Sequence, residues 1–257
     1  MLAVAGAQAA IQMVPLLGRP GRARVLVPTY DEHAACLHAA GWTVEEAGSL
    51  AELEGADLAV VVNPNNPDGR THGREAIMRL SEKVGRLVVD ESFVDPVPEL
   101  SVTPMAGQGG LIVLRSFGKF YGLAGLRLGF VVASGPDIAQ LSEMAGPWPV
   151  AGPALAVGTL ALTDRTWAQA TRERLVKETV AIDALAVTAG WRPTGGTALF
   201  RLYGTPDASA AQDQLARCRI WSRIFRGSPG WIRLGLPGSP TEWQRLAAAL
   251  NGTPHGV

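Results

Sequence analysis

Residues 111–127 have the sequence LIVLRSFGKFYGLAGLR, in which four apolar residues lead into a polar, glycine-rich segment. An unbroken apolar run is typical of a strand that is buried on both faces of a sheet. The segment that follows contains Lys119, one of only three lysines in the chain, among Phe117, Phe120 and Tyr121. We expect these apolar neighbours to desolvate the amine and lower its pKa, which would make Lys119 a competent nucleophile.

Two similar runs precede this stretch and also end in polar residues. Residues 58–62 lead to Asn63, and residues 87–89 lead to Asp90. Further strands are predicted at 25–27 and 128–133, and helices at 31–40, with Asp31 as its cap, and at 74–84. Strands that alternate with helices predict an α/β fold with a mostly parallel sheet. Ligand-binding residues of such sheets gather beyond the carboxyl ends of the strands.

The pattern changes after the Pro- and Gly-rich stretch 146–153. A long helix is predicted there, followed by short strands and a closing helix, at 163–189, 198–203, 220–225, 231–234 and 241–250. We therefore expect a large domain over residues 1–150 and a smaller C-terminal α+β domain over residues 151–257.

The composition narrows the possible partners. Lys and Arg total 23, Asp and Glu total 23, and the formal net charge of the 257-residue chain is zero. This balance gives no electrostatic reason to expect nucleic acid or an anionic membrane as a partner. Cys36 and Cys218 are too few for a disulfide scaffold, suit a cytoplasmic protein and take part in no metal-binding spacing. Three prolines interrupt the uncharged residues 144–163, so no membrane-spanning helix is expected there.

Each group of polar residues that follows a predicted strand has, taken alone, a purely structural interpretation. The segment 63–69 could be a turn, Asp90 could cap the next helix, and a lone lysine is usually a solvated surface group. Together the clusters make one chemical set. A lysine can form a Schiff base with an aldehyde, an aspartate can pair with a protonated pyridine nitrogen, and an asparagine amide can donate to a ring phenolate. Ser116 and Arg127 can hold a phosphate by charge-assisted hydrogen bonds. The lysine and the aspartate are the two protein groups that pyridoxal phosphate requires.

On these residues the chain resembles the class I/II aminotransferase family of fold-type I pyridoxal-phosphate enzymes. The Asn-Pro-x-Gly element at 66–69, the strand that ends at Asp90, and the Ser-x-x-Lys segment at 116–119 followed by Arg127 have the family's order. The resemblance implies pyridoxal 5'-phosphate as the cofactor. It also implies a three-layer αβα fold with a mostly parallel sheet and a smaller C-terminal α+β domain.

The resemblance further implies a role for each residue that matches the family's motifs. Lys119 would bind the cofactor covalently, Asp90 would hold the pyridinium nitrogen, and Asn66 would contact the ring hydroxyl. Ser116 and Arg127 would bind the cofactor phosphate. The remaining matches are Gly6, Ala7 and Gln8 at the phosphate, Tyr30 stacked on the ring, and Arg233 on the substrate carboxylate.

Within the family, the chain is similar to histidinol-phosphate aminotransferases and to the threonine-phosphate decarboxylases of cobalamin biosynthesis. The string 114–123, the stretch 147–154 and Phe93, where aminotransferases usually carry a tyrosine, resemble the decarboxylases. The resemblance implies decarboxylation of O-phospho-L-threonine to (R)-1-amino-2-propanol O-phosphate. The alternatives are an aminotransferase of the histidinol-phosphate type and an inactive remnant that keeps the fold.

Two further expectations follow from the resemblance. The family usually places its site at a dimer interface, so we expect a homodimer that acts on a small phosphorylated amino acid. Family members are longer at the front, whereas this chain begins almost at Gly6. We therefore expect two parts to be missing: the amino-terminal arm and the segment that supplies a tyrosine to the partner subunit's cofactor. This expectation motivates the alternative that the chain is an inactive remnant.

Overall fold

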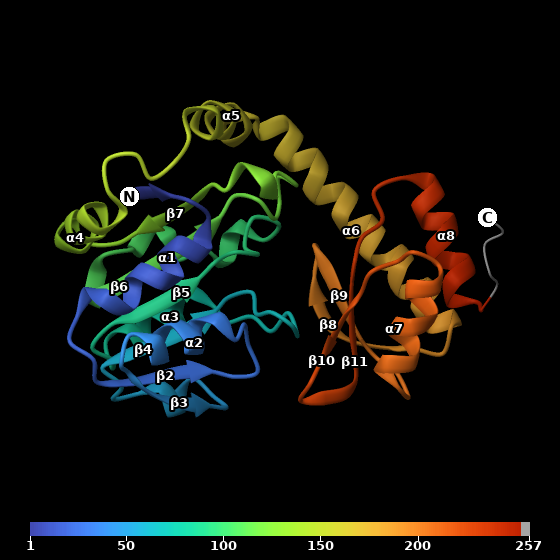
Figure 1. The fold of residues 1–257 in the computed structure, drawn as a ribbon, viewed down its shortest axis with the longest axis horizontal. Helices are drawn as coiled ribbons and strands as arrows, with labels where there is room; N and C mark the ends of the chain where they lie inside the picture. Colours follow the sequence, from blue (N-terminus) through green and yellow to red (C-terminus); the bar gives the residue numbers. More distant parts are fainter. Residues whose placement is uncertain (253–257) are drawn as a thin grey trace. The chain divides into compact units, whose positions relative to one another are not determined.

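The computed structural model describes residues 1–252, which form two compact units. The large unit comprises Met1–Asn66 and Arg70–Arg165. The small unit comprises Pro67–Gly69 and the described residues from Thr166 onward. Figure 1 shows a sheet with helices in the first unit and a separate small sheet with helices in the second.

A seven-stranded sheet with the order β1-β7-β6-β5-β4-β2-β3 forms the centre of the large unit. Strands β2 to β6 run parallel, whereas β7 pairs antiparallel with both β6 and β1. The strands are β1 (Leu2–Val4), β2 (Arg22–Leu26), β3 (Thr43–Ala47), β4 (Leu58–Val62), β5 (Leu87–Asp90), β6 (Leu111–Ser116) and β7 (Gly129–Val132). The predicted α/β fold with a mostly parallel sheet is confirmed.

Five α-helices and several single turns of 3-10 helix complete the large unit. The α-helices are α1 (Ala7–Met13), α2 (Glu32–Ala39), α3 (Arg74–Ser81), α4 (Gly135–Ala145) and α5 (Gly152–Thr163). The 3-10 turns are η1 (Val14–Leu17), η2 (Ala51–Leu53), η3 (Pro98–Leu100), η4 (Thr103–Met105), η5 (Gln108–Gly110) and η6 (Ala124–Leu126). Asp31 precedes α2 as predicted, but its side chain makes no capping hydrogen bond, so the predicted cap is wrong.

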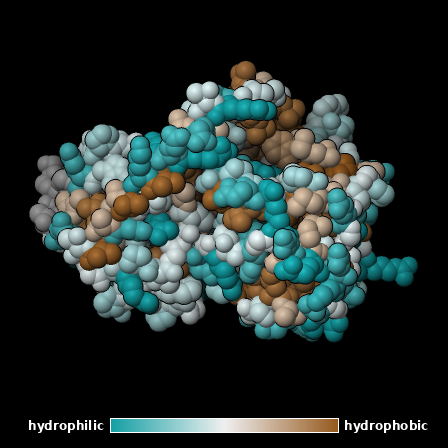
Figure 2. All heavy atoms as spheres, turned by 180° about the vertical axis from the view of Figure 1, so that it is seen from behind, coloured by the Kyte–Doolittle hydropathy of each residue, from teal (hydrophilic) through white to brown (hydrophobic). Residues whose placement is uncertain are grey.

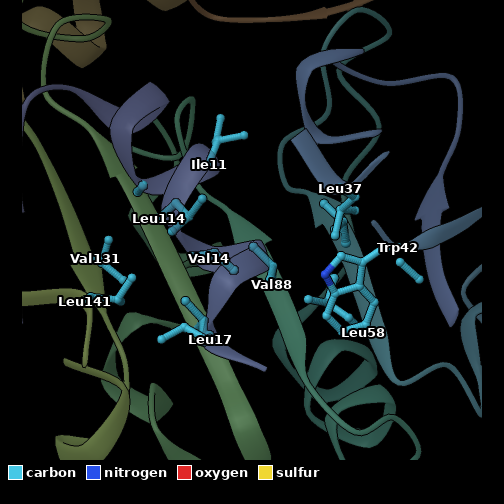
Figure 3. Packing of buried hydrophobic residues seen from close by; sticks show 14 of the residues in the cluster. Ile11, Val14, Leu17, Leu37, Trp42, Leu58, Val88, Leu114, Val131 and Leu141 are labelled. Carbon is cyan, nitrogen blue, oxygen red and sulfur yellow. The ribbon is translucent and has the colours of Figure 1, made fainter. Parts of the chain in front are cut away.

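The core of the large unit lies on both faces of the sheet. Neighbouring residues of a strand point to opposite faces, so Val60 and Val61 of β4 belong to different apolar clusters. The cluster around Val60 includes side chains of α1, α2 and α4, and Figure 3 shows how these pack against the sheet. The cluster around Val61 includes Ile77 of α3. Helices therefore cover both faces of the sheet, which gives the expected three-layer αβα arrangement.

The boundary between the units lies later than the sequence predicts. Residue 150 was the expected end of the large domain, but the large unit continues to Arg165 and includes α5. Ala154 and Gly158 of α5 are buried, and a Cβ at Gly158 would lie 2.4 Å from Cδ2 of Leu128. This close approach packs α5 onto the large unit, so the helix belongs to that unit.

The small unit contains a four-stranded antiparallel sheet with the order β10-β11-β9-β8. Its strands are β8 (Arg192–Thr197), β9 (Phe200–Gly204), β10 (Arg223–Phe225) and β11 (Ser228–Gly235), and its helices are α6 (Arg165–Thr188), α7 (Ala208–Arg217) and α8 (Pro240–Leu250). Ile182, Tyr203 and Leu246 lie in its apolar core. Among residues 1–252, no helix combines the length and the apolar character needed to cross a membrane.

Candidate active site

Asp90 is the last residue of β5 and is almost fully buried, with 2% of its surface exposed. Its Oδ1 accepts two hydrogen bonds from Ser92, one from the backbone N at 2.9 Å and one from Oγ at 2.5 Å. Its Oδ2 lies 2.9 Å from Nε2 of His33. Burial alone would raise the pKa of Asp90, but the interactions with His33 and Ser92 hold that pKa below its usual value. Asp90 is therefore a buried carboxylate that stays ionised at neutral pH.

His33 is a site residue that the sequence did not reveal. It lies in the first turn of α2 and is 4% exposed. The five-residue spacing of His33 and His38 argues against a metal site shared by the two side chains. Nothing in the sequence indicates that one of them faces the end of a strand. The helical pattern held a weak signal, because His33 and Leu37 are four residues apart and both are buried on the sheet side.

Lys119 follows β6, the parallel neighbour of β5. The carboxyl ends of parallel strands meet at one edge of a sheet, so Lys119 and Asp90 belong to the same edge. The Lys119 side chain is exposed, with Nζ 5.8 Å from the ring centroid of Phe93. Phe117 and Phe120 are buried instead. The two phenyl rings next to Lys119 in the sequence are therefore buried while the lysine side chain is exposed, and the lowered pKa of its amine stays a prediction.

Arg127 and Gly6 lie against each other at this edge. Both have a positive φ, 52° at Arg127 and 79° at Gly6, and Arg127 has the left-handed helical conformation. A Cβ at Gly6 would lie 2.6 Å from Nη2 of Arg127, so the guanidinium occupies the space that a larger residue would need. The structure thus brings together two of the residues that the sequence assigns to a phosphate.

Ser116 and Ala7 lie next to this pair. Ser116 ends β6 and is paired with Gly129 of β7. A Cβ at Gly129 would lie 2.5 Å from the backbone N of Ala7, so only glycine allows the start of α1 to approach the strand so closely. Gly6, Ala7, Ser116 and Arg127 consequently lie together at this edge, and because the backbone N of Gly6 donates to the carbonyl O of Val4 at 2.7 Å, the donors of this cluster belong to Ala7, Ser116 and Arg127.

Tyr30 and Gln8 connect this cluster to Asp90. The Oη of Tyr30 donates a hydrogen bond to Oε1 of Gln8 at 3.5 Å. The Tyr30 ring meets the His33 ring edge-on, with centroids 6.3 Å apart and an interplanar angle of 86°. Because His33 also contacts Asp90, Tyr30 lies one side chain away from the buried carboxylate. Tyr30 is 40% exposed, so its ring is accessible to a ligand.

The asparagines that follow β4 differ in what they contact. Asn63 is bound through its amide to the backbone N and O of His72. Asn65 donates to the carbonyl O of Pro28 and accepts from Oγ1 of Thr29, both at 2.7 Å. These two side chains hold the loop, as the turn interpretation expects. Asn66, the residue that the family resemblance assigns to the ring hydroxyl, is half-buried in the same loop.

Glu91 is a second buried carboxylate that the sequence did not single out. It is 0% exposed and accepts hydrogen bonds from Oγ of Ser101 and the backbone N of Val102, both at 2.5 Å. Arg115 of β6 places Nη1 3.4 Å from the Glu91 carboxylate, and its Nη2 contacts Asp95 at 2.5 Å. This network ties the loop after β5 to the end of β6, and so it fixes the two strand ends that carry Asp90 and Ser116.

Arg233 belongs to the small unit, where it lies in β11. Its Cζ lies 5.0 Å from the ring centroid of Phe200, which fits a cation–π contact. Burial lowers the pKa of Arg233, and the positive charge of Arg223, its partner across the strands, lowers that pKa further. A half-buried guanidinium next to a like charge is well suited to receive an anion.

The sequence is similar to known proteins along almost its whole length. The family model described as Aminotransferase class I and II matches residues 1–250. The threonine-phosphate decarboxylase of Pseudomonas aeruginosa is 45% identical over 98% of this chain and 78% of the relative. The threonine-phosphate decarboxylase of a Sinorhizobium species is 42% identical over 97% of this chain and 76% of the relative.

A solved structure gives the same picture of the fold. The crystal structure of L-threonine-O-3-phosphate decarboxylase from Porphyromonas gingivalis is 23% identical to this chain, with a TM-score of 0.82. The match covers 97% of this chain and 82% of that one. The two chains therefore share their fold.

Proposed function

The chain belongs to the aminotransferase class I and II family, and from this premise we propose that it is a pyridoxal-phosphate-dependent lyase that decarboxylates O-phospho-L-threonine. The product would be (R)-1-amino-2-propanol O-phosphate, an intermediate for cobalamin biosynthesis. The observation that carries this proposal is the 45% identity to a threonine-phosphate decarboxylase over 98% of the chain. The unpaired thiols of Cys36 and Cys218 suit a cytoplasmic enzyme, which we include in the proposal.

The residues of the large unit fit pyridoxal phosphate. A buried carboxylate that remains ionised, Asp90, suits a protonated pyridine nitrogen. Ala7, Ser116 and Arg127 offer donors for a phosphate, and Gly6 leaves the space in which the Arg127 guanidinium lies. The other residues that we propose to hold the cofactor are Gln8, Tyr30 and Asn66, with Lys119 as the amine that binds it covalently.

When bound, pyridoxal phosphate would supply an aldehyde for the amino group and a ring that withdraws electrons from the α carbon. The chain's own residues have complementary tasks. Asp90 would keep a negative charge at the ring nitrogen, and Nζ of Lys119, protonated as the ammonium, would give a proton to the α carbon and become the neutral amine. In the small unit, the guanidinium of Arg233 would bind the carboxylate of the substrate by a two-pronged contact.

Phe93 favours decarboxylation over amino-group transfer in this proposal. Its ring lies 5.8 Å from Nζ of Lys119. A phenyl ring has no hydroxyl to donate, whereas a tyrosine, which the aminotransferases of the family usually carry here, could donate to the ring oxygen of the cofactor. The absence of this donor would change the electron distribution of the bound ring. Amino-group transfer remains the second candidate function, because the family description itself names aminotransferases.

The direct test is release of carbon dioxide from O-phospho-L-threonine by the purified protein with pyridoxal phosphate. We expect stoichiometric carbon dioxide and amino-propanol phosphate, with no requirement for a 2-oxo acid. L-Threonine is the matched control substrate, because it lacks only the phosphate. Transfer of the amino group to 2-oxoglutarate without carbon dioxide release would reject the decarboxylase in favour of the aminotransferase.

The homodimer is also part of the proposal. The segment around α5 exposes large apolar side chains: Trp148 is 89% exposed, Leu160 73%, Leu162 48% and Leu155 43%. Figure 2 shows apolar residues among polar ones at the top of the molecule, where Figure 1 places α5. Large exposed apolar side chains gathered around one helix typically mark a protein–protein interface. A second copy of the chain, as the family resemblance implies, would cover it.

We expect Leu160→Glu to weaken this dimer. Burying a leucine stabilises an interface by about 1.5–3 kcal/mol, so replacing it with a charged residue should raise the dissociation constant by about tenfold or more. Val180→Glu is a matched control, because Val180 is similarly exposed, at 67%, but lies in α6. Light scattering over a range of protein concentrations measures the effect. A wild-type chain that stays monomeric at high concentration with cofactor bound would contradict the proposal.

A further inference from the structure

We propose that Gly195 of β8 is a positioning residue, which holds Asn66 in place for the cofactor through a close crossing of two backbones. The crossing joins Asp68 and Gly69 to Gly195 and Gly196, and we call these four residues the glycine crossing. This inference rests on the proposed binding of pyridoxal phosphate by Asn66. None of the four residues is proposed to touch the cofactor or the substrate.

The loop that follows β4 is divided between the two units. Asn66 ends the first segment of the large unit, whereas Pro67–Gly69 belongs to the small unit. The backbone N of Asn65 donates to the carbonyl O of Arg70 at 2.8 Å, and this hydrogen bond closes the base of the loop within the large unit. Along the chain, Asn66 therefore lies between a base that belongs to one unit and a tip that belongs to the other.

Backbone atoms of β8 hold the tip of the loop within the small unit. The backbone N of Gly196 donates to the carbonyl O of Asp68 at 2.8 Å. β8 is an edge strand of the four-stranded sheet, and an edge strand has backbone groups that no strand of its own sheet can pair. The loop tip supplies an acceptor to one of these groups. Both atoms belong to the backbone, so the hydrogen bond requires the two segments to approach closely.

Only glycine allows this approach. A Cβ at Gly195 would overlap the carbonyl O of Asp68, and a Cβ at Gly69 would overlap the carbonyl O of Gly196. Gly69 and Gly196 also have a positive φ, 73° and 129°, which by itself favours glycine.

Gly195 is the residue that separates the two reasons for glycine. It has no positive φ, so its backbone conformation would accept an L residue. A glycine inside a strand weakens the strand, and it often marks a place where another backbone comes close. The carbonyl of Asp68 comes close in this way, so the crossing explains the glycine at position 195.

Pro67 carries the hold of the glycine crossing back to Asn66. The proline ring fixes φ of Pro67 at about −65°. It also restricts the preceding residue, Asn66, to extended conformations. Few backbone rotations therefore remain free between the anchored carbonyl of Asp68 and the backbone of Asn66. A displacement of the loop tip should consequently move the Asn66 amide.

The pKa at the ring oxygen of the cofactor is the property that responds to Asn66. An amide N–H that donates to an ionised oxygen favours the ionised form and lowers the pKa of that group. Displacement of Asn66 would remove this donor and raise the pKa. The visible absorbance of bound pyridoxal phosphate depends on this ionisation, so a pH titration of the absorbance reports where the amide lies.

The test titrates the absorbance of pyridoxal phosphate bound to the full chain, without substrate. Gly195→Ala adds one methyl group where the carbonyl O of Asp68 lies. Asn66→Ala removes the amide itself, and a double variant combines both changes. Gly235→Ala is the matched control, because Gly235 also lies in a strand of the small unit, has no positive φ, and a Cβ there would meet no atom within 4 Å. Far-ultraviolet circular dichroism shows whether each variant is folded.

We expect Asn66→Ala to raise the midpoint pH of the titration by about one unit or more, the shift that corresponds to loss of a hydrogen bond to a charged oxygen. Gly195→Ala should raise the midpoint by about half a unit or more, because it displaces the amide without removing it. Gly235→Ala should match the wild type. The double variant should match Asn66→Ala, because two changes that act through one group do not add.

A folded Gly195→Ala protein with the wild-type midpoint would overturn the inference. Shifts that add in full in the double variant would also overturn it, because Gly195 would then act without Asn66. If Gly195→Ala does not fold, Pro67→Ala decides, since it leaves the glycine crossing intact but frees the link to Asn66. A raised midpoint in Pro67→Ala supports the inference, and a wild-type midpoint contradicts it.

These readouts separate the inference from the proposed function. A raised midpoint in Asn66→Ala with a wild-type midpoint in Gly195→Ala would reject the role of the glycine crossing and leave the proposed cofactor binding intact. A wild-type protein that binds pyridoxal phosphate but releases no carbon dioxide would reject the reaction, and the midpoint of Gly195→Ala would still decide the inference. A wild-type protein that binds no pyridoxal phosphate would overturn both.

Discussion

Lys119→Ala is expected to lower the rate of carbon dioxide release by about 10⁴-fold, the upper end of what a positioned proton donor contributes. The variant should also lose the visible absorbance of covalently bound pyridoxal phosphate, because no other amine is available at this sheet edge. The other two lysines, Lys83 and Lys177, are remote in sequence and lie on or beside helices α3 and α6. The expected result therefore depends on one exposed amine at the end of β6.

Lys177→Ala is the matched control for this experiment. Lys177 is exposed on α6, so its removal tests the effect of losing a surface amine alone. Activity and absorbance of this variant should equal those of the wild type. A Lys119→Ala protein that keeps more than about a tenth of the activity would contradict the proposed role. A wild-type protein without cofactor absorbance would instead support the inactive remnant.

Asp90→Asn should lower the rate by about 10³-fold, similar to the loss of a preorganised electrostatic group in other active sites. The substitution keeps the shape of the side chain but removes the negative charge. An amide cannot hold a proton on a ring nitrogen as a carboxylate does, so the bound ring would withdraw electrons less strongly. Steady-state rates measure the effect, and the pH dependence of cofactor absorbance shows whether the ring nitrogen has lost its proton.

The same variant should change the response of the folded protein to acid. The pKa of Asp90 lies below its ordinary value of 3.8 in the folded chain. Its contribution to stability is therefore present above pH 3.8 and is lost as the pH falls through the lowered pKa. Asp90→Asn should lose less thermal stability than the wild type as the pH falls below 3.8. Asp213→Asn, a change at an exposed position of α7, should behave like the wild type in both experiments.

The sequence predicted the central strands well because their burial leaves a strong signal. Residues 58–62 form β4 with the predicted bounds, and an unbroken apolar run of this kind is required where helices cover both faces. β3 was missed because its sequence, TVEEA, is largely polar, as befits a strand at the edge of the sheet. β8 was missed because it contains Pro193 and two glycines, which are rare inside strands.

The candidate site was predicted in part for the same reason. Strand ends are visible in the sequence, so Asp90, Ser116 and Lys119 could be placed at one edge of the sheet. The partners of those residues could not, because the contact between His33 and Asp90 joins positions 57 residues apart. The exposure of Lys119 could not be predicted, because aromatic neighbours in the sequence need not be neighbours in space. Only the folded loop decides that Phe117 and Phe120 point inward.

The carboxylate at position 91 also limits how the protein can evolve. Three neutral donors and Arg115 converge on Glu91, which is closed to water. Loss of Glu91 would leave the Arg115 guanidinium with one carboxylate partner fewer. Loss of Arg115 would leave the buried negative charge of Glu91 without its cationic partner. We therefore expect substitutions at these two positions to be tolerated best when both residues change together. Glu91 and Arg115 should therefore be found together in related sequences, although neither is proposed to contact the cofactor or the substrate.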